Sequence, residues 1–273
     1  MTHHSYIPSF PLNRFISGFT YYKGYTSDHT IDRYLPNGNI EIIINLTHTP
    51  KYIYNNHTLT ETQACKKVWI SGLRSGFISI PSGTGSEMFI IEFKKGMAHS
   101  FLGMPLTEIT ERVVEGDLVL NRVFLEMREQ LLEKQSVPAM FLTAEKMLSD
   151  EFRNKLVINP LVEFAVNSIV ANPAQVTIKS IAHKTGYSPR HFIETFSSHV
   201  GVNPKSFLRI LRFQKAINEI QTRGNINWIA LADECGYYDQ AHLIANFKEF
   251  SGFTPVQYIE NTTGEWLNYV PVA

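Results

Sequence analysis

The spacing of hydrophobic and polar positions changes twice along the chain. From about residue 30 to 95, β-branched runs alternate with turn residues, as in RYLPNGNIEIIINL, WISGLRSGFISIPSG and MFIIEFKKG, which favours strands. Between about 105 and 172, apolar positions recur at helical spacing, as in DLVLNRVFLEMREQLLEK and LVEFAVNSIV. From there to about 260, the helical patterns are short and sharply punctuated.

This order of patterns predicts an α+β chain. We expect an N-terminal β-rich domain with trailing helices over residues 1–155, a helical linker over 156–172 and an all-α domain over 173–260. The last boundary follows the Asn172–Pro173 step, because a residue before proline avoids the helical region.

The all-α part contains one pattern twice. GYSPRHFIETFSSHVGVNPKSF begins at Gly186, and GYYDQAHLIANFKEFSGFTPVQY begins at Gly236. The second copy is one residue longer, and aligning the two copies places the extra residue in a turn around Tyr237–Tyr238. An insertion there disturbs no helix face. Between the copies, PKSFLRILRFQKAINEI has the apolar spacing of one long amphipathic helix.

The first copy has the signals of helix, tight turn and helix. Thr177 is expected to cap one helix, and Gly186 to end it in the left-handed conformation. Ser188 then caps a second helix, in which Phe192 and Phe196 form a buried stripe.

The second copy repeats this plan with different residues. Asn227 is expected to cap its first helix, and Gly236 to end it. Asp239 caps the next helix, in which Leu243 and Phe247 are buried. The all-α domain is therefore predicted to be two helix-turn-helix units joined by a long helix.

The buried stripes leave one face of each second helix outside. In the first unit this face contains Arg190, Ile193, Glu194 and Ser197, and in the second Gln240, Ala241, Ile244, Ala245 and Lys248. Two such units can place their second helices in successive major grooves of duplex DNA, roughly 34 Å apart. Arginine can bind guanine, glutamine can bind adenine, and isoleucine can contact thymine methyl groups.

These segments resemble the AraC/XylS family of bacterial transcription regulators. The resemblance covers about residues 172–260 and is carried by IAHKTGYSPRHFIETFSSHVGVNPKSFLRILR and IALADECGYYDQAHLIANFKEFSGFTPVQY. It implies double-stranded DNA as a partner, and RNA polymerase as the natural protein partner. The positions to which it assigns base contacts are Arg190, Ile193 and Glu194 in the first unit and Gln240, Ala241, Ile244 and Ala245 in the second.

The N-terminal part is similar to a domain found in a subset of these regulators. RYLPNGNIEIIINL, WISGLRSGF and FIIEFKKGMAHSFLGMPLTEITERVV carry the resemblance in order and spacing. It implies a cupin-like β-structure that binds a small effector, forms a homodimer, or both. Strand alternation allows Glu41, Arg74 and Glu92 to face either a ligand or water. The alternative is a DNA-binding adaptor whose N-terminal domain binds a protein partner or itself, with no small ligand.

Charge separates the two units, although the chain as a whole has 25 basic and 25 acidic side chains. Residues 184–215 have six basic side chains against one acidic, a balance of +5, and residues 216–260 have two against six, a balance of −4. The first unit is therefore expected to supply most of the attraction to phosphates. The acidic half suits either a basic protein surface or plain solvation.

The remaining chemistry argues against an enzyme. The β region has no HxH pair for a cupin metal site, and Cys65 stands alone, without the cysteine cluster that a zinc-dependent DNA-repair methyltransferase needs. His191 and His242 occupy the same slot of both copies, which favours packing over metal binding. No catalytic residue, metal or cofactor is expected. With two cysteines, no signal-peptide pattern and no apolar run of bilayer length, we expect a cytoplasmic protein and no membrane partner.

Overall fold

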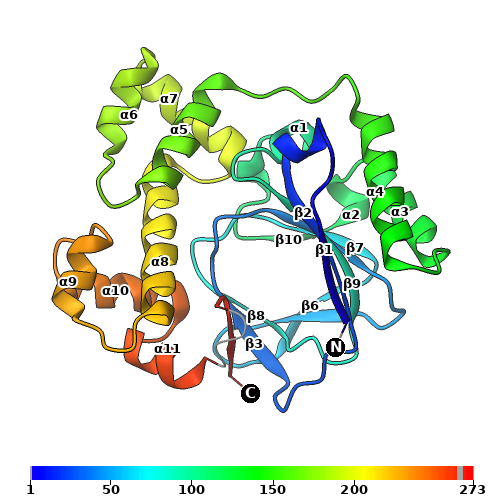
Figure 1. Cartoon of the computed structure of the whole chain (residues 1–273), viewed down its shortest axis with the longest axis horizontal. Helices are drawn as coiled ribbons and strands as arrows, with labels where there is room; N and C mark the ends of the chain where they lie inside the picture. Colours follow the sequence, from blue (N-terminus) through cyan, green and yellow to red (C-terminus); the bar gives the residue numbers. More distant parts are fainter. Residues whose placement is uncertain (1, 263–266, 273) are drawn as a thin grey trace.

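The computed structural model describes residues 2–262 and 267–272. A β-rich N-terminal half lies beside a helical C-terminal half, and the long helix α8 (Pro204–Thr222) runs along the boundary between them (Figure 1). The chain is therefore α+β, as its sequence predicts.

The strands form two antiparallel sheets that enclose a cavity between them. The first sheet has the order β1 (Thr2–Tyr6), β2 (Ile16–Lys23), β9 (Glu87–Phe93), β4 (Glu41–Asn45), β7 (Val68–Ser71) and β10 (Val113–Glu115). The second has the order β11 (Tyr269–Pro271), β3 (Ile31–Tyr34), β8 (Ile78–Pro81), β5 (Lys51–Tyr54) and β6 (Glu61–Cys65). The strands thus begin well before residue 30, where the sequence pattern first indicates them.

The central strands of the first sheet are apolar on both faces. Ile42 of β4 and Ile91 of β9 are fully buried in the main core, whereas Ile43 and Ile90 line the cavity between the sheets. Two-sided burial explains why MFIIEF is an almost continuous hydrophobic run instead of an alternating one.

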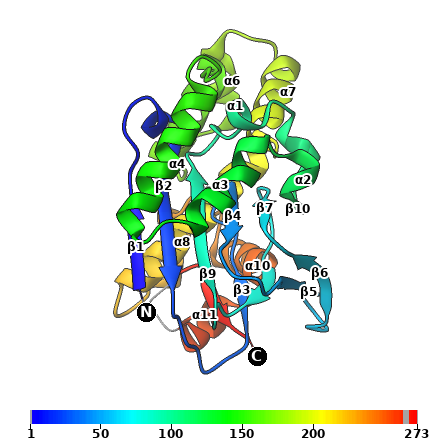
Figure 2. The same ribbon diagram turned by 90° about the vertical axis from the view of Figure 1, so that its right-hand side faces the viewer.

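Helices α3 (Arg122–Leu132) and α4 (Val137–Phe152) pack on the outer face of the first sheet (Figure 2). The apolar run DLVLNRVFLEMREQLLEK is split between α2 (Gly116–Val119) and α3, because the Asn121 side chain caps α3. Leu118 is left exposed. The buried Arg128 of α3 donates to the carbonyls of Asn45 (2.7 Å) and Thr47 (3.1 Å), which fixes α3 against the end of β4.

The β-rich half also contains the short helix α1 (His99–Leu102) and the 3-10 turns η1 (Leu12–Arg14) and η2 (Leu106–Glu108). The helical half follows α4 in the chain. Its elements are α5 (Pro160–Ala171), α6 (Ile178–Thr185), α7 (Pro189–Val200), α8, α9 (Trp228–Glu234), α10 (Gln240–Ser251) and α11 (Pro255–Asn261). Here "first unit" means α6 with α7, and "second unit" means α9 with α10. Within the described residues, no helix is long and apolar enough to cross a bilayer.

After α11 the chain returns to the β-rich half. Strand β11 pairs antiparallel with β3, with Tyr269 opposite Tyr34 and Val270 opposite Arg33. Val270 is fully buried. The last strand of the N-terminal structure is therefore supplied by the far end of the chain (Figure 1).

Candidate nucleic-acid interface

Local capping fixes the first unit. The Thr177 hydroxyl accepts the Ser180 N–H (3.1 Å) at the start of α6, and Gly186, with φ +72°, ends that helix. The Ser188 hydroxyl accepts the His191 N–H (3.3 Å) at the start of α7. These contacts satisfy backbone donors that a helix leaves unpaired, and they set the angle of the turn.

The second helix of the first unit buries one stripe and exposes another. Phe192 and Phe196 are completely buried, with their ring centroids 6.0 Å apart. The face predicted to read bases lies on the opposite side, where Arg190, Ile193 and Glu194 are exposed and Ser197 is half-buried. The Ile193 side chain is 44% exposed, so an apolar group is presented to solvent in the middle of this face.

Arg190 has an acidic neighbour on this face. Its Nε lies 2.8 Å from Oε1 of Glu194, one helical turn away, and both side chains are mostly solvent-exposed. An exposed pair of this kind contributes little to stability. It leaves the terminal amino groups of the guanidinium for a base edge or a phosphate oxygen.

The second unit repeats the capping with other side chains. Asn227 Oδ1 accepts the Ile229 and Ala230 N–H groups (both 3.1 Å), and Asp239 accepts the His242 N–H (2.7 Å). Gly236 has φ +80°, and a Cβ there would lie 2.6 Å from the Ala174 carbonyl oxygen. Only glycine fits both requirements.

The extra residue of the second unit lies in its turn. Tyr237 is buried, and its ring packs edge-on to His242 with centroids 5.4 Å apart, whereas Tyr238 is 92% exposed. The turn therefore extends outward without changing the phase of α10. On that helix Ala241, Ala245 and Lys248 are exposed, and Gln240 and Ile244 are half-buried.

His191 and His242, which occupy equivalent positions in the two units, each contact the turn of their own unit. The His191 ring packs on Tyr187, with centroids 4.9 Å apart, and His242 Nδ1 accepts the Tyr238 N–H (3.3 Å). Among the described residues, no group of three histidine, cysteine or acidic side chains is placed to hold a metal ion.

Some of the cations that give residues 184–215 their balance of +5 are bonded to groups inside the protein. Arg209 pairs with Glu249 and donates to Asn246 of α10, and Arg212 Nε donates to the Pro173 carbonyl (2.8 Å). These guanidinium groups hold α8 against its neighbours. Among the cations of residues 184–215, those that stay exposed are Lys184, Arg190 and Lys205, so the outward charge is smaller than +5.

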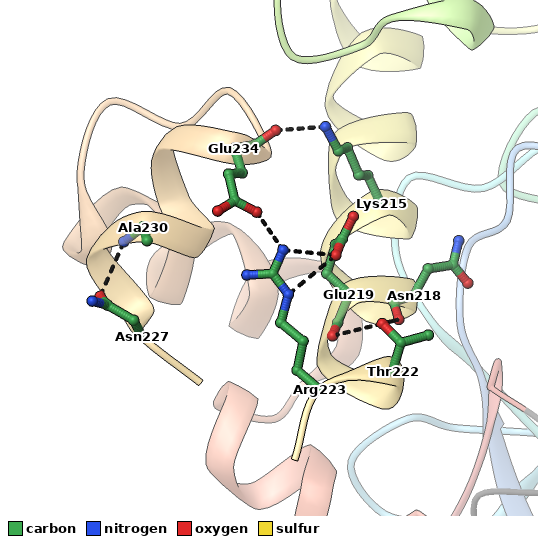
Figure 3. A network of polar contacts seen from close by, with 8 residues as sticks. All are labelled: Lys215, Asn218, Glu219, Thr222, Arg223, Asn227, Ala230 and Glu234. Atoms are coloured by element: carbon green, nitrogen blue, oxygen red, sulfur yellow. Dashed lines mark hydrogen bonds and ion pairs between the residues drawn. The ribbon is translucent and has the colours of Figure 1, made fainter. Parts of the chain in front are cut away.

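Ion pairing also reduces the negative balance of residues 216–260. Figure 3 shows Arg223 between Glu219 of α8 and Glu234 of α9, with Nη2 2.8 Å from Glu219 Oε2. Lys215 donates to the Glu234 backbone carbonyl (2.6 Å). This network joins the long helix to the first helix of the second unit. Formal charge along the sequence therefore overstates the acidity of this surface.

A second candidate site lies between the two sheets of the β-rich half. The cavity has a volume of about 220 Å³. Its wall is mostly aliphatic and aromatic, from Tyr22, Tyr34, Ile43, Ile53, Trp69, Ile78, Ile80, Met88, Ile90 and Tyr269 among others. The polar groups that reach it include Glu41, Lys51 and the Asp32 carboxylate, which lies 2.8 Å from His29 Nε2.

Of the three ligand candidates, Glu41 lines the cavity. Burial, and then the nearby Glu92 carboxylate, raise the pKa of Glu41 to about 7, and the Tyr34 hydroxyl donates to its Oε1 (2.8 Å). Glu92 does not line the cavity but accepts from the Asn39 side chain, and burial raises its pKa.

Arg74 also lies outside the cavity wall, where it donates to the Glu111 carbonyl (3.1 Å). The three candidates are therefore not brought together around one space. Sequence patterns missed the tyrosines that do line it. Tyr22 lies on a strand before the predicted β region, and Tyr269 lies beyond the predicted helical domain.

Comparison with known protein families agrees with both halves of this description. Residues 181–261 match the family model of a helix-turn-helix domain, and residues 4–115 match a domain of unknown function, DUF6597. The C-terminal region is thus an AraC-type helix-turn-helix domain, and it follows a β-rich DUF6597 domain.

Individual relatives are regulators. An uncharacterized HTH-type transcriptional regulator of Haemophilus influenzae is 32% identical over 81 residues, which are 30% of this chain and 27% of that protein. The uncharacterized HTH-type transcriptional regulator YbfI of Bacillus subtilis is 28% identical over 123 residues, 45% of this chain and 40% of that protein. The matches thus span well under half of either relative. They agree with the expectation of a regulator instead of an enzyme.

Among solved structures, the crystal structure of ToxT from Vibrio cholerae is similar over 90% of this chain and 98% of its own, with 12% identity and a TM-score of 0.44.

Proposed function

We propose that this protein is a sequence-specific transcription regulator that binds double-stranded DNA. One observation carries the proposal: two separately capped helix-turn-helix units each bury an apolar stripe and expose the opposite face of the second helix. In this arrangement α7 and α10 enter successive major grooves. The relatives' description as transcriptional regulators supports the same function.

The residues proposed to contact bases are those predicted from the sequence. In the first unit they are Arg190, Ile193, Glu194 and Ser197, and in the second Gln240, Ala241, Ile244, Ala245 and Lys248. Exposure of the first set is higher, because only Ser197 of its four residues is half-buried, whereas Gln240 and Ile244 of the five in the second set are half-buried. We therefore assign most base discrimination to the first unit.

The test is binding of the full chain to duplexes selected from a random library, measured by fluorescence anisotropy at several salt concentrations. Affinity should fall steeply with salt, because phosphate contacts release counterions. Arg190→Ala should weaken binding about 5- to 150-fold and relax preference at one base position.

A matched control is Arg122→Ala, which removes an exposed arginine from α3 of the β-rich half. It should leave affinity within about 2-fold, since a single charge distant from the duplex is screened. No duplex binding at low salt would contradict the proposed function. A loss for Arg190→Ala that is equal across all sequences would assign that residue to the phosphate backbone.

We further propose that the β-rich domain binds a small effector. The cavity favours this over the adaptor alternative, because a domain used only for dimerisation has no need of an internal space with convergent polar groups. Its lining suits a small, mainly apolar molecule with a polar group near Glu41.

A neutral aromatic probe, N-phenyl-1-naphthylamine, tests whether the cavity accepts such a molecule. Its fluorescence should rise on binding to the full chain, and Ile43→Trp, which fills the cavity from β4, should abolish the rise. Ile7→Trp makes the same change at an exposed position and should have no effect. Equal fluorescence for both variants would favour the adaptor instead.

A further inference from the structure

The wall of the cavity includes a strand that comes after the helix-turn-helix domain. Tyr269 and Pro271 of β11 both line it. The Tyr269 ring packs on Tyr34 with centroids 4.8 Å apart, and Tyr34 in turn donates its hydroxyl to the cavity carboxylate of Glu41. The contact path from Glu41 therefore reaches the C-terminal strand in two steps.

The same strand is tied to the DNA-binding half. The Tyr258 hydroxyl of α11 donates to the Leu267 carbonyl (2.8 Å), two residues before β11. The Gln214 side chain of α8 donates to Asn268 Oδ1 and to the Pro36 carbonyl (both 2.8 Å). Gln214 thus holds together the long helix, the approach to β11 and the turn that follows β3.

Further contacts join the second unit to the same sheet. The Arg33 guanidinium of β3 lies between the rings of Phe77 and Phe253, 4.4 and 4.5 Å from their centroids. Phe253 lies two residues after the end of α10, and burial lowers the pKa of Arg33. Arg33 is also the partner of Val270 across the strand pair. One strand, β3, therefore contacts the cavity, β11 and the segment that follows the second unit.

We propose that Tyr269 is a residue of the effector site, and that this site is complete only while β11 is paired with β3, so that cavity occupancy and DNA binding are thermodynamically linked through β11. The proposal rests on the function proposed above and names the regulation of that site. A ligand that contacts Tyr269 binds with a different free energy when β11 is paired with β3 than when β11 is displaced. A duplex that moves α10 and α11 shifts the same equilibrium, and linkage makes the effect reciprocal.

The first experiment asks whether duplex binding changes the β3–β11 pairing. Two amides report on it, since Leu35 N–H donates to the Asn268 carbonyl (2.8 Å) and Val272 N–H donates to the Ile31 carbonyl (3.0 Å). Hydrogen exchange of the full chain is measured with and without saturating duplex. We expect exchange at both amides to change at least 3-fold. Unchanged exchange in a sample whose anisotropy shows bound duplex would overturn the proposal.

The second experiment changes the cavity and measures DNA affinity. Ile43→Phe narrows the cavity from the opposite sheet and should change the dissociation constant for the selected duplex at least 3-fold. In a Tyr269→Ala background the same change should have less than about a 1.5-fold effect. A Tyr54→Ala background, which removes a half-buried tyrosine of β5 outside the cavity wall, should preserve the full effect.

The outcomes separate the two proposals. Equal effects of Ile43→Phe in the Tyr269→Ala and Tyr54→Ala backgrounds would overturn the role of β11 while leaving DNA binding intact. If the unsubstituted full chain binds no duplex, the proposed function itself fails. Native exchange protection in α7 and α10 of each variant shows that the helix-turn-helix domain has remained folded.

Discussion

The two helix-turn-helix units share their backbone plan but differ in how they meet the rest of the molecule. Both are capped by a small polar side chain, Ser188 or Asp239, and both bury a phenylalanine at the same step, Phe196 or Phe247. Local sequence therefore fixes each unit in the same way. What surrounds the units depends on tertiary contacts that the repeat does not encode.

The first unit contacts the β-rich half near the end of α7. The Thr110 hydroxyl donates to the Gly201 carbonyl, and the rings of His99 and His199 stack with centroids 4.0 Å apart. The segment that follows the second unit instead contacts the other sheet, next to the cavity. Phe253 packs on Arg33 of β3, and Tyr258 of α11 donates to the Leu267 carbonyl, two residues before β11. From these contacts we infer that the second unit responds to the cavity, while the first contributes most to reading DNA.

The greatest loss of stability should come from deleting the equivalent core rings. Phe196→Ala and Phe247→Ala each remove a completely buried phenyl group, and each should lower the free energy of unfolding by about 3–5 kcal/mol. Urea unfolding measures the total cost, and hydrogen exchange shows where protection is lost.

The location of the lost protection tests the comparison. Phe196→Ala should weaken protection in α6 and α7 and leave β11 protected. Phe247→Ala should also lower protection in β11, because the Phe247 and Tyr258 ring centroids lie 5.4 Å apart and Tyr258 bonds to Leu267 just before that strand. If both variants deprotect β11 equally, the two units are not coupled to the cavity in different ways.

The second prediction uses opposite pH dependences at the first unit's contact with the β-rich half and at the cavity. Glu41 has a folded-state pKa of about 7 against an ordinary value of 4.5, so the folded state loses stability as pH rises through that window. Burial, and then His199, lower the pKa of His99, so its contribution is lost as pH falls below 6.5. Acid should therefore weaken the first contact and favour the environment of Glu41.

Unfolding in urea between pH 5 and 8 checks this contrast. Relative to the unsubstituted protein, Glu41→Gln should gain roughly 1–3 kcal/mol between pH 5 and pH 8, because the buried carboxylate no longer has to ionise. His99→Gln should gain stability in the opposite direction, from pH 7 to pH 5. Equal pH slopes for the two variants would contradict the assignment.

The features that the sequence predicts depend on residues close together in the chain, and those that it does not predict depend on residues far apart in the chain. Thr177, Ser188, Asn227 and Asp239 are caps in the structure as the sequence predicts, because capping depends on residues two or three positions away. Strand β11 could not be predicted, since three residues, YVP, form a strand only against β3, more than 200 residues earlier in the chain.

The candidate sites divide in the same way. Helix periodicity locates Arg190 and Ile193 on the exposed side of α7, because Phe192 and Phe196 fix the phase of that helix. Strand alternation leaves the direction of Glu41 open until its neighbours Tyr34 and Tyr269 are known. The charge balance of +5 fails to describe the surface, because the sequence does not show that Arg212 bonds to the Pro173 carbonyl.

The most modest change should come from the acidic surface of the second unit. Glu219 and Glu234 are engaged with Arg223 (Figure 3). Asp233 is exposed and makes no ion pair within the described residues. We propose that Asp233 belongs to a surface that contacts a basic region of RNA polymerase, because opposite potentials steer association. Asp233→Lys should then lower transcription from a target promoter several-fold, while affinity for duplex holds or improves.

A matched change, Glu133→Lys, reverses an exposed acidic charge at the end of α3 and should leave both readouts unchanged. Stability of both variants should stay within about 0.5 kcal/mol, as expected for surface positions without a structural partner. Promoter activity and duplex affinity are measured on the same variants. If output follows duplex affinity alone, the acidic surface is simply solvated, and the second unit differs from the first only in its contact with the cavity.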